Sequence, residues 1–164
     1  MDSADSMTVL GAPDIDGLVF RPFRGRSDYP GMVAVRAEAG VYDQVDPLSP
    51  RATIPTLDDI ARAYAETPTG SPNVLVVEVG GRMIGYNELQ WWAEQDGTSV
   101  YLHLGWLAPA WRGKGIGTAM LRYAERRLAR LRYHRTPIIA IEKVDNRRAF
   151  LLYLGDDAVG SPRR

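Results

Sequence analysis

A glycine-rich segment that leads into an amphipathic helix constrains this chain more than any other part of its sequence. The segment reads Trp111-Arg112-Gly113-Lys114-Gly115-Ile116-Gly117-Thr118. Apolar residues then recur every three or four positions, which predicts a helix over residues 116–131. Because the first amides of a helix have no partner within it and the helix dipole is positive there, such a start can bind a phosphate group.

The alternating glycines at 113, 115 and 117 allow the backbone to approach a phosphate closely, and Arg112 and Lys114 add positive charge. Two other phosphate-binding loops do not fit the spacing. A Walker loop requires Ser or Thr after its lysine, whereas Gly115 follows Lys114. A dinucleotide fingerprint requires its third glycine at position 118, which is Thr118. A glycine-rich turn with a purely structural role stays open as an alternative.

The remaining pattern predicts one domain of mixed α/β (α+β) class. Residues 1–17 are acidic and read as a flexible N-terminal tail, and residues 156–164 read as a polar tail. Gly80-Gly81 and Asp96-Gly97 are hairpin signals that predict an antiparallel meander of three strands. We expect strands over residues 18–23, 73–79, 82–92, 98–107 and 137–141, and helices over residues 28–40, 56–66, 116–131 and 146–154.

The composition excludes several classes of function. The chain has 164 residues, zero formal net charge and no cysteine, which rules out disulfides, thiolate zinc sites and a cysteine nucleophile. We therefore expect a cytoplasmic protein with no metal site, no nucleic-acid partner and no membrane partner. The segment from Trp111 to Arg135 carries eight basic residues against Glu125 alone, which suits a polyanionic small ligand.

The stretch from Val100 to Leu131 resembles the central motif of the GNAT superfamily of N-acetyltransferases, in which a strand, a proline, the pattern R-x-x-G-x-G and an amphipathic helix follow one another. The order of elements from Leu18 to Leu154 is similar as well. The resemblance implies a mostly antiparallel central sheet with helices on both faces in an acetyltransferase domain over residues 18–155. It also implies a bacterial enzyme that uses acetyl-CoA to acetylate a primary amine of a small molecule by direct attack.

The resemblance assigns roles to individual residues. The pantetheine arm of acetyl-CoA pairs with the backbone of Gly105, Trp106 and Leu107. Asn146 contacts the same arm, and Tyr153, seven residues later, protonates the leaving thiolate. The pyrophosphate is held by the glycine segment, namely Arg112, Gly113, Lys114, Gly115, Ile116, Gly117 and Thr118.

Three residues are candidates for the base that deprotonates the amine. His103 titrates in the right range, and the resemblance places its strand towards the acceptor. Glu88 is second and Glu142 third. The alternatives are a buried histidine satisfied by the backbone and carboxylates that face solvent. Trp91 and Trp92 are adjacent in a strand and so point to opposite faces, where one can wall the acceptor site.

The C-terminal end departs from the family pattern. The family continues after its tyrosine into two more strands, but this chain ends nine residues after Gly155. We therefore expect the C-terminal strands to be missing. Three explanations stay open: a fragment or first half of a tandem acetyltransferase, a homodimer or partner chain that completes the sheet, and a degenerate protein. The alternative function is a non-catalytic acyl-CoA-binding half-domain or sensor.

Overall fold

The fold is an antiparallel sheet between two layers of helices. The computed structural model describes residues 6–43, 54–93, 95, 99–132, 138–144 and 147–154. Six strands lie in the order β1-β2-β3-β4-β6-β5, and each neighbouring pair is antiparallel. They are β1 (Leu18–Pro22), β2 (Val74–Val79), β3 (Arg82–Ala93), β4 (Ser99–Leu107), β5 (Ile138–Val144) and β6 (Arg147–Leu154). The predicted fold class is confirmed.

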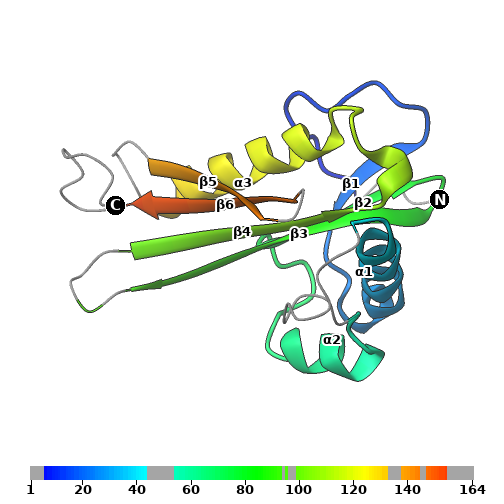
Figure 1. Cartoon of the computed structure of the whole chain (residues 1–164), viewed down its shortest axis with the longest axis horizontal. Helices are drawn as coiled ribbons and strands as arrows, with labels where there is room; N and C mark the ends of the chain where they lie inside the picture. The colour runs from blue at the N-terminus through cyan, green and yellow to red at the C-terminus, as the bar shows by residue number, and fades with distance from the viewer. Residues whose placement is uncertain are drawn as a thin grey trace.

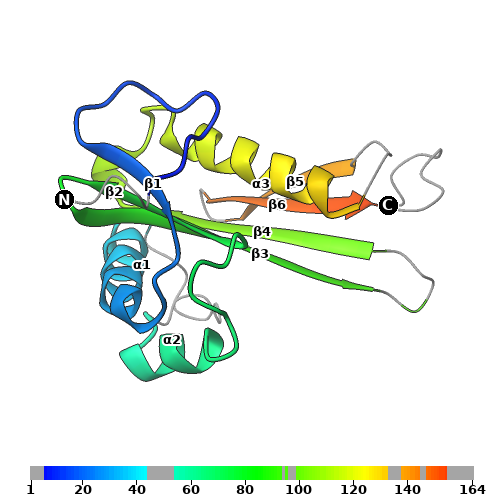
Figure 2. The ribbon, with the colours of Figure 1, turned by 180° about the vertical axis from the view of Figure 1, so that it is seen from behind.

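Helices cover both faces of this sheet, as Figures 1 and 2 show. On one face lie α1 (Tyr29–Asp43) and α2 (Leu57–Ala63), and on the other lies α3 (Ile116–Arg132). Two short 3-10 turns, η2 (Gly25–Asp28) and η3 (Pro109–Trp111), precede α1 and the glycine segment. Thr56 caps α2, because its hydroxyl accepts the Asp59 amide while the Asp59 carboxylate accepts the Thr56 amide.

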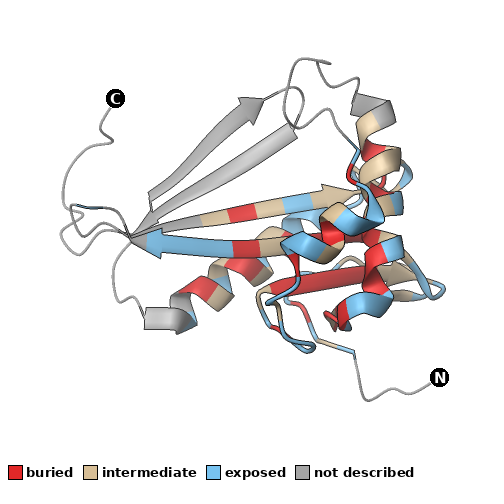
Figure 3. Ribbon diagram, turned by 90° about the horizontal axis from the view of Figure 1, so that it is seen from below, coloured by how far each residue is buried: buried red, intermediate tan, exposed pale blue. Residues whose placement is uncertain are grey.

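Strand β2 supplies side chains to both hydrophobic cores. Val74 and Val76 pack into the core beneath α1 and α2, whereas Leu75 and Val77 pack into the core beneath α3. All four are at most 2% exposed. Such a strand shows a continuous apolar run instead of alternation, because successive side chains point to opposite faces and both faces are covered. Figure 3 shows the buried residues gathered where the helices meet the sheet.

An irregularity in β3 brings this strand close to β4. The register steps from Val77 opposite Gly85 to Glu78 opposite Met83, so that Ile84 is an extra residue on β3. Next to it, a Cβ atom on Gly85 would lie 2.8 Å from the Trp106 carbonyl oxygen. Glycine is therefore required at position 85, because any side chain would push away the β4 backbone.

One predicted helix is wrong. Residues 147–154 form β6, which pairs with β4 and with β5, whereas we expected a short helix over 146–154 and doubted a sixth strand. The segment has good helix formers, but an isolated helix of this length gains little unless it packs. Placed between β4 and β5, the same segment obtains backbone hydrogen bonds on both sides.

The first described residues pack on the domain, although we expected residues 1–17 to form a flexible tail. Val9 is 6% exposed and belongs to the core beneath α3. The Met7 amide donates to the Phe20 carbonyl oxygen at 2.7 Å, which extends the edge of β1. An apolar side chain near an otherwise open strand edge explains the docking. The limits of the domain stay a prediction.

A buried ion triad joins the start of the chain to the sheet. The Arg21 guanidinium on β1 contacts Asp28 Oδ1 at 2.7 Å and Glu78 Oε1 at 2.5 Å. Arg21 and Asp28 have side chains only 3% and 4% exposed. Burial alone would lower the pKa of Arg21, but the hydrogen bonds and charges of Asp28 and Glu78 outweigh it and raise that pKa. The triad fixes β1, η2 and β2 relative to one another.

We expect Arg21→Leu to lower the free energy of unfolding by about 3–5 kcal/mol, because it leaves buried carboxylates without a counter-charge. Urea denaturation at neutral pH measures this change. Arg62→Leu is the matched control, since Arg62 pairs with Asp59 at 2.7 Å but its side chain is 78% exposed. The control should cost less than about 1 kcal/mol. Equal losses in the two variants would contradict the role of the triad.

Candidate active site

The glycine segment forms a cradle at the start of α3. Gly113 and Gly115 have φ values of +73° and +86°, in the left-handed region that favours glycine. A Cβ atom added at Gly113 or Gly117 would meet no other atom within 4 Å, so open space lies beside both residues. The first amides of α3 have no acceptor within the helix. The residues present therefore fit a bound pyrophosphate.

Buried side chains hold α3 in place. Ile116, Ala119 and Met120 are at most 2% exposed and pack against Leu75, Val77 and Ile84 in the core beneath α3. These three residues belong to the first turns of the helix. The burial therefore fixes the amides that precede them, whereas Gly117 and Thr118 face solvent on the same turns.

Charged side chains of the segment have specific partners. Arg112 Nε donates to the Leu107 carbonyl oxygen at 3.0 Å, which ties the segment to the end of β4. Lys114 Nζ lies 4.8 Å from the centre of the Trp111 ring, within range of a cation–π contact. Both cations thus stand beside the start of α3, where their charge adds to that of the helix dipole.

Strand β4 has an edge that is open near the glycine segment. Its pairing with β6 runs from Ser99 opposite Leu154 to His103 opposite Phe150. From Leu104 to Leu107, the described strands pair only with the β3 side of β4. The backbone of Gly105, Trp106 and Leu107, predicted to bind the pantetheine arm, belongs to this open stretch.

The structure does not bring Tyr153 to this stretch. Tyr153 lies in β6 opposite Val100 of β4 and opposite Ile138 of β5. Between Val100 and Leu107 the strand advances roughly 24 Å, at about 3.4 Å per residue. Asn146 lies outside the described residues. Glu142 lies in β5 opposite Ala149, separated from β4 by β6.

His103 is a buried residue on the α3 side of the sheet. It is 7% exposed, and its Nε2 lies 3.1 Å from Nδ2 of Asn87. Asn87 Nδ2 also donates to the Met120 carbonyl oxygen of α3 at 3.2 Å. Burial lowers the pKa of His103 to about 4. The imidazole is therefore neutral at pH 7, and its basic nitrogen faces an amide donor, which suits a structural role better than the predicted role of base.

Glu88 lies on the opposite face of the sheet, towards α2. Its Oε2 accepts the Tyr64 hydroxyl at 2.6 Å, and its Oε1 accepts Gln90 Nε2 at 2.5 Å. Burial and the neighbouring Glu88 charge raise the pKa of Tyr64, so this hydroxyl stays protonated and donates. In the described part of the chain, Glu88 forms no ion pair.

A stack of aromatic and cationic groups continues from Glu88 towards the open stretch of β4. The rings of Tyr86 and Trp106 stack with their centres 4.7 Å apart. The Arg36 guanidinium of α1 lies 4.9 Å from the centre of the Trp106 ring. Trp106 is thus held from the α1 side while its backbone belongs to the predicted cofactor-binding stretch. Sequence analysis did not single out Arg36, Tyr64 or Tyr86.

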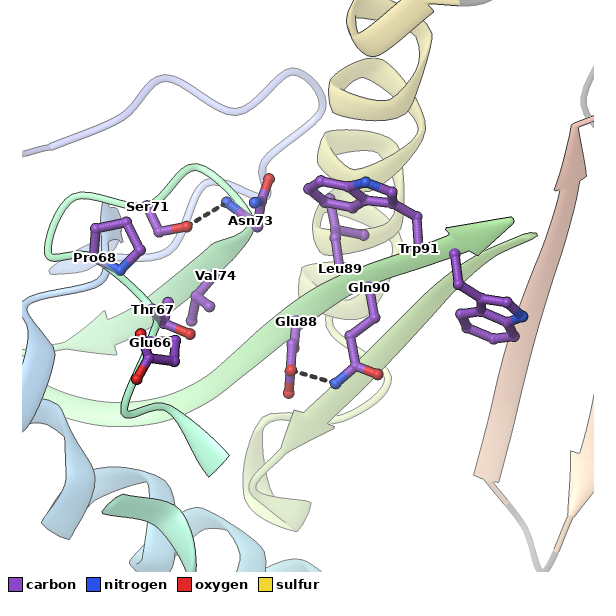
Figure 4. A pocket seen from close by; sticks show the side chains of 11 residues that line it. Glu66, Thr67, Pro68, Ser71, Asn73, Val74, Glu88, Leu89, Gln90 and Trp91 are labelled. Atoms are coloured by element: carbon purple, nitrogen blue, oxygen red, sulfur yellow. Dashed lines mark hydrogen bonds between the residues drawn. The ribbon is translucent and has the colours of Figure 1, made fainter. Parts of the chain in front are cut away.

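A pocket of about 460 Å³ opens beside Glu88. Figure 4 shows Glu88 and Gln90 on one side of β3 and Leu89 and Trp91 on the other. Glu66, Trp92 and the loop that follows α2 complete the wall, and none of the described residues that line it is basic. Trp91 and Trp92 are 46% and 43% exposed. They are adjacent in β3 as predicted, but neither is buried and both contribute to the wall of this pocket, whereas only one was expected to wall a site.

Among the described residues, no group of three or more His, Asp or Glu side chains is placed to hold a metal ion. None of the helices in the described ranges is long and apolar enough to cross a membrane.

Comparison with known proteins identifies the class. The profile of the acetyltransferase (GNAT) family matches residues 41–155, which is more than half of the chain. The chain therefore belongs to the GNAT acetyltransferases, a family that uses acetyl-CoA as co-substrate. A search of curated proteins gave no match.

Solved structures with low sequence identity share the fold. A GCN5-related N-acetyltransferase from Sphaerobacter thermophilus is 16% identical with a TM-score of 0.57, and the match covers 76% of this chain. This chain spans 37% of the length of that structure. A GNAT acetyltransferase from Streptococcus pneumoniae is 12% identical with a TM-score of 0.51, covering 84% of this chain and 98% of that one. The structure of yncA from Salmonella typhimurium was solved with its cofactor acetyl-CoA. It is 19% identical with a TM-score of 0.49, and the match covers 90% of this chain and 99% of that one.

We expect Gly113→Ala to weaken the binding of CoA about tenfold, because the new methyl group occupies the open space beside the helix start. Gly81→Ala is the matched control. Gly81 has a φ of +80° and equally open surroundings but lies in the β2–β3 turn. Both variants should lose about 1–2 kcal/mol of stability from backbone strain. Isothermal titration calorimetry then separates them, and equal affinities for CoA would contradict the cradle.

His103 makes the free energy of unfolding depend on pH. Its folded pKa of about 4 is lower than its ordinary value of 6.5, so the unfolded chain binds a proton that the folded chain does not. Stability is therefore lost as the pH falls from 6.5 towards 4. We expect His103→Gln to flatten this dependence by about 1 kcal/mol per pH unit. Urea denaturation between pH 7 and pH 4.5 measures it, and parallel curves for parent and variant would show that His103 is not buried neutral.

Proposed function

We propose that this protein is an acetyl-CoA-dependent N-acetyltransferase that acts on a primary amine of a small molecule. Membership of the family supports acetyl transfer. That the acceptor atom is an amine nitrogen, and that the acceptor is a small molecule, is proposed in addition. The observation that carries it is the position of Glu88. Glu88 lies opposite Leu104, where the open stretch of β4 begins, and its carboxylate forms no ion pair in the described part of the chain.

The pocket beside Glu88 is the proposed acceptor site. A half-buried carboxylate whose hydrogen-bond partners are the neutral Tyr64 and Gln90 attracts a cation. Glu66 adds a second negative charge, and the indole rings of Trp91 and Trp92 offer faces to an ammonium group. The pocket size suits a small molecule. A protein N-terminus or lysine is a variant of this acceptor that the same chemistry allows.

The proposed reaction is a direct transfer. Glu88 removes a proton from the bound ammonium group, and the free amine attacks the thioester carbonyl carbon. The new C–N bond forms as the C–S bond breaks. The nitrogen then gives up its second proton, and the sulfur, which leaves as thiolate, takes up one proton to become the thiol. The backbone of Gly105, Trp106 and Leu107 is proposed to orient the pantetheine arm, and residues 112–118 the pyrophosphate. We retain Glu88 as the base in preference to His103. We do not propose Tyr153 as the group that protonates the thiolate.

Free thiol released from acetyl-CoA in the presence of a panel of small amines tests the activity. We expect release above the buffer rate with at least one cationic amine. CoA binding with no thiol release across the panel would contradict catalysis and favour a non-catalytic acyl-CoA sensor. The cytoplasmic location also stays a prediction.

Glu88→Gln should lower kcat, raise the KM for the amine about tenfold and leave the KM for acetyl-CoA unchanged. Glutamine still accepts the Tyr64 hydroxyl, but it offers no charge to the ammonium group and no base. Steady-state kinetics with the best amine of the panel measures kcat and the two KM values. Glu125→Gln is the control, a carboxylate on α3 across the sheet. A Glu88→Gln enzyme with parental constants would exclude Glu88 from the acceptor site.

A further inference from the structure

The side chain of Asn87 connects its own strand, β3, to two neighbouring strands and to the helix that covers them. Asn87 is fully buried in β3. Its Oδ1 accepts the Leu75 amide of β2 at 3.1 Å. Its Nδ2 lies 3.2 Å from the Met120 carbonyl oxygen of α3 and 3.1 Å from His103 Nε2 of β4. One side-chain amide thus touches β2, β4 and α3.

The contacts leave only one orientation for this amide. Its oxygen faces an amide donor and its nitrogen faces a carbonyl oxygen, so a flipped amide would place like groups against each other at both positions. Each of the two hydrogens on Nδ2 then has its own acceptor, Met120 or His103. His103 Nε2 must carry the lone pair, which places the ring proton on Nδ1. Every polar atom of the Asn87 side chain is used.

Two of the partners mark the two halves of the acetyl-CoA site. Met120 lies one turn after Ile116, where α3 begins beside the pyrophosphate cradle. His103 is the last residue of β4 that pairs with β6, and the open stretch proposed for the pantetheine arm begins at the next residue. Apolar packing alone allows a helix to slide over a sheet with little change in buried area. Directed hydrogen bonds to both elements do not.

We propose that Asn87 is a positioning residue that sets the distance between the pyrophosphate cradle and the open stretch of β4. The inference rests on the cofactor site described above. It concerns binding and does not depend on which amine is acetylated. A ligand that spans both halves gains affinity only when their separation matches its length, because misplacement by about 1 Å can cost up to two orders of magnitude. A ligand that occupies one half has no such requirement.

The test compares a ligand that spans both halves with one that occupies a single half. Asn87→Leu keeps the branching and the number of heavy atoms of the side chain and removes all three hydrogen bonds. We expect its Kd for CoA to rise about tenfold, while its Kd for adenosine 3′-phosphate 5′-diphosphate, which lacks the pantetheine arm, stays within about twofold of the parent. Isothermal titration calorimetry with the folded full chain measures both. Equal weakening of the two ligands, or no weakening of CoA, would overturn the proposal.

A second and milder variant guards against loss of the fold. His103→Leu removes one of the three partners, and we expect its Kd for CoA to rise about threefold with the same selectivity for the longer ligand. Leu128→Ala is the control for general destabilisation, because Leu128 is 2% exposed on α3 but is not a hydrogen-bond partner of Asn87. It should lower the melting temperature and leave both Kd values within about twofold. A control that matches Asn87→Leu in ligand selectivity would overturn the positioning role. These measurements use binding and not thiol release. They therefore test the role of Asn87 even if the proposed catalysis fails.

Discussion

The burial of both faces of β2 is the constraint on which the rest of the structure depends. Val74 and Val76 need a layer on one side, and Leu75 and Val77 need a layer on the other. Helices α1 and α2 provide the first layer and α3 the second. Because α3 must place Ile116, Ala119 and Met120 over this strand, its first amides come to lie beside the end of β4. The cofactor cradle is thus a consequence of core packing as well as of glycine content.

The two faces of the sheet divide the chemistry between them. The α3 face holds the helix start, the cationic side chains Arg112 and Lys114, and the neutral, buried His103. The α1 and α2 face holds Glu88, its partner Tyr64 and the acidic pocket. A polyanionic cofactor and a cationic acceptor would therefore approach β4 from opposite sides, each towards charge of the opposite sign. The open stretch from Leu104 to Leu107 is where the two approaches meet.

The sequence predicted the elements around the glycine segment better than the surroundings of Glu88. The glycine spacing and the periodicity of residues 116–131 are local patterns, and α3 begins at Ile116 as expected. The partner of Glu88 is Tyr64, which is 24 residues away and belongs to the end of α2, so no local pattern could pair them. Asn87 lies directly before Glu88 and close to Gln90 in β3, so its local sequence did not mark it as buried. The burial of its side chain and its hydrogen-bond partners became visible only in the folded sheet.

Local patterns also explain the one wrong element. Residues 147–154 have helix-forming side chains. They form strand β6 because they pair with the edges of β4 and β5, which only the assembled sheet presents. For the same reason, the spacing of Tyr153 along the chain did not determine which residue of β4 lies opposite it. By itself, the sequence determined the glycine cradle, the helix that follows it and the meander, since these arise from contacts between near neighbours. The tertiary structure alone decided that His103 is buried, that Glu88 borders a pocket and that Asn87 joins helix to strand, because each depends on contacts between residues far apart in the chain.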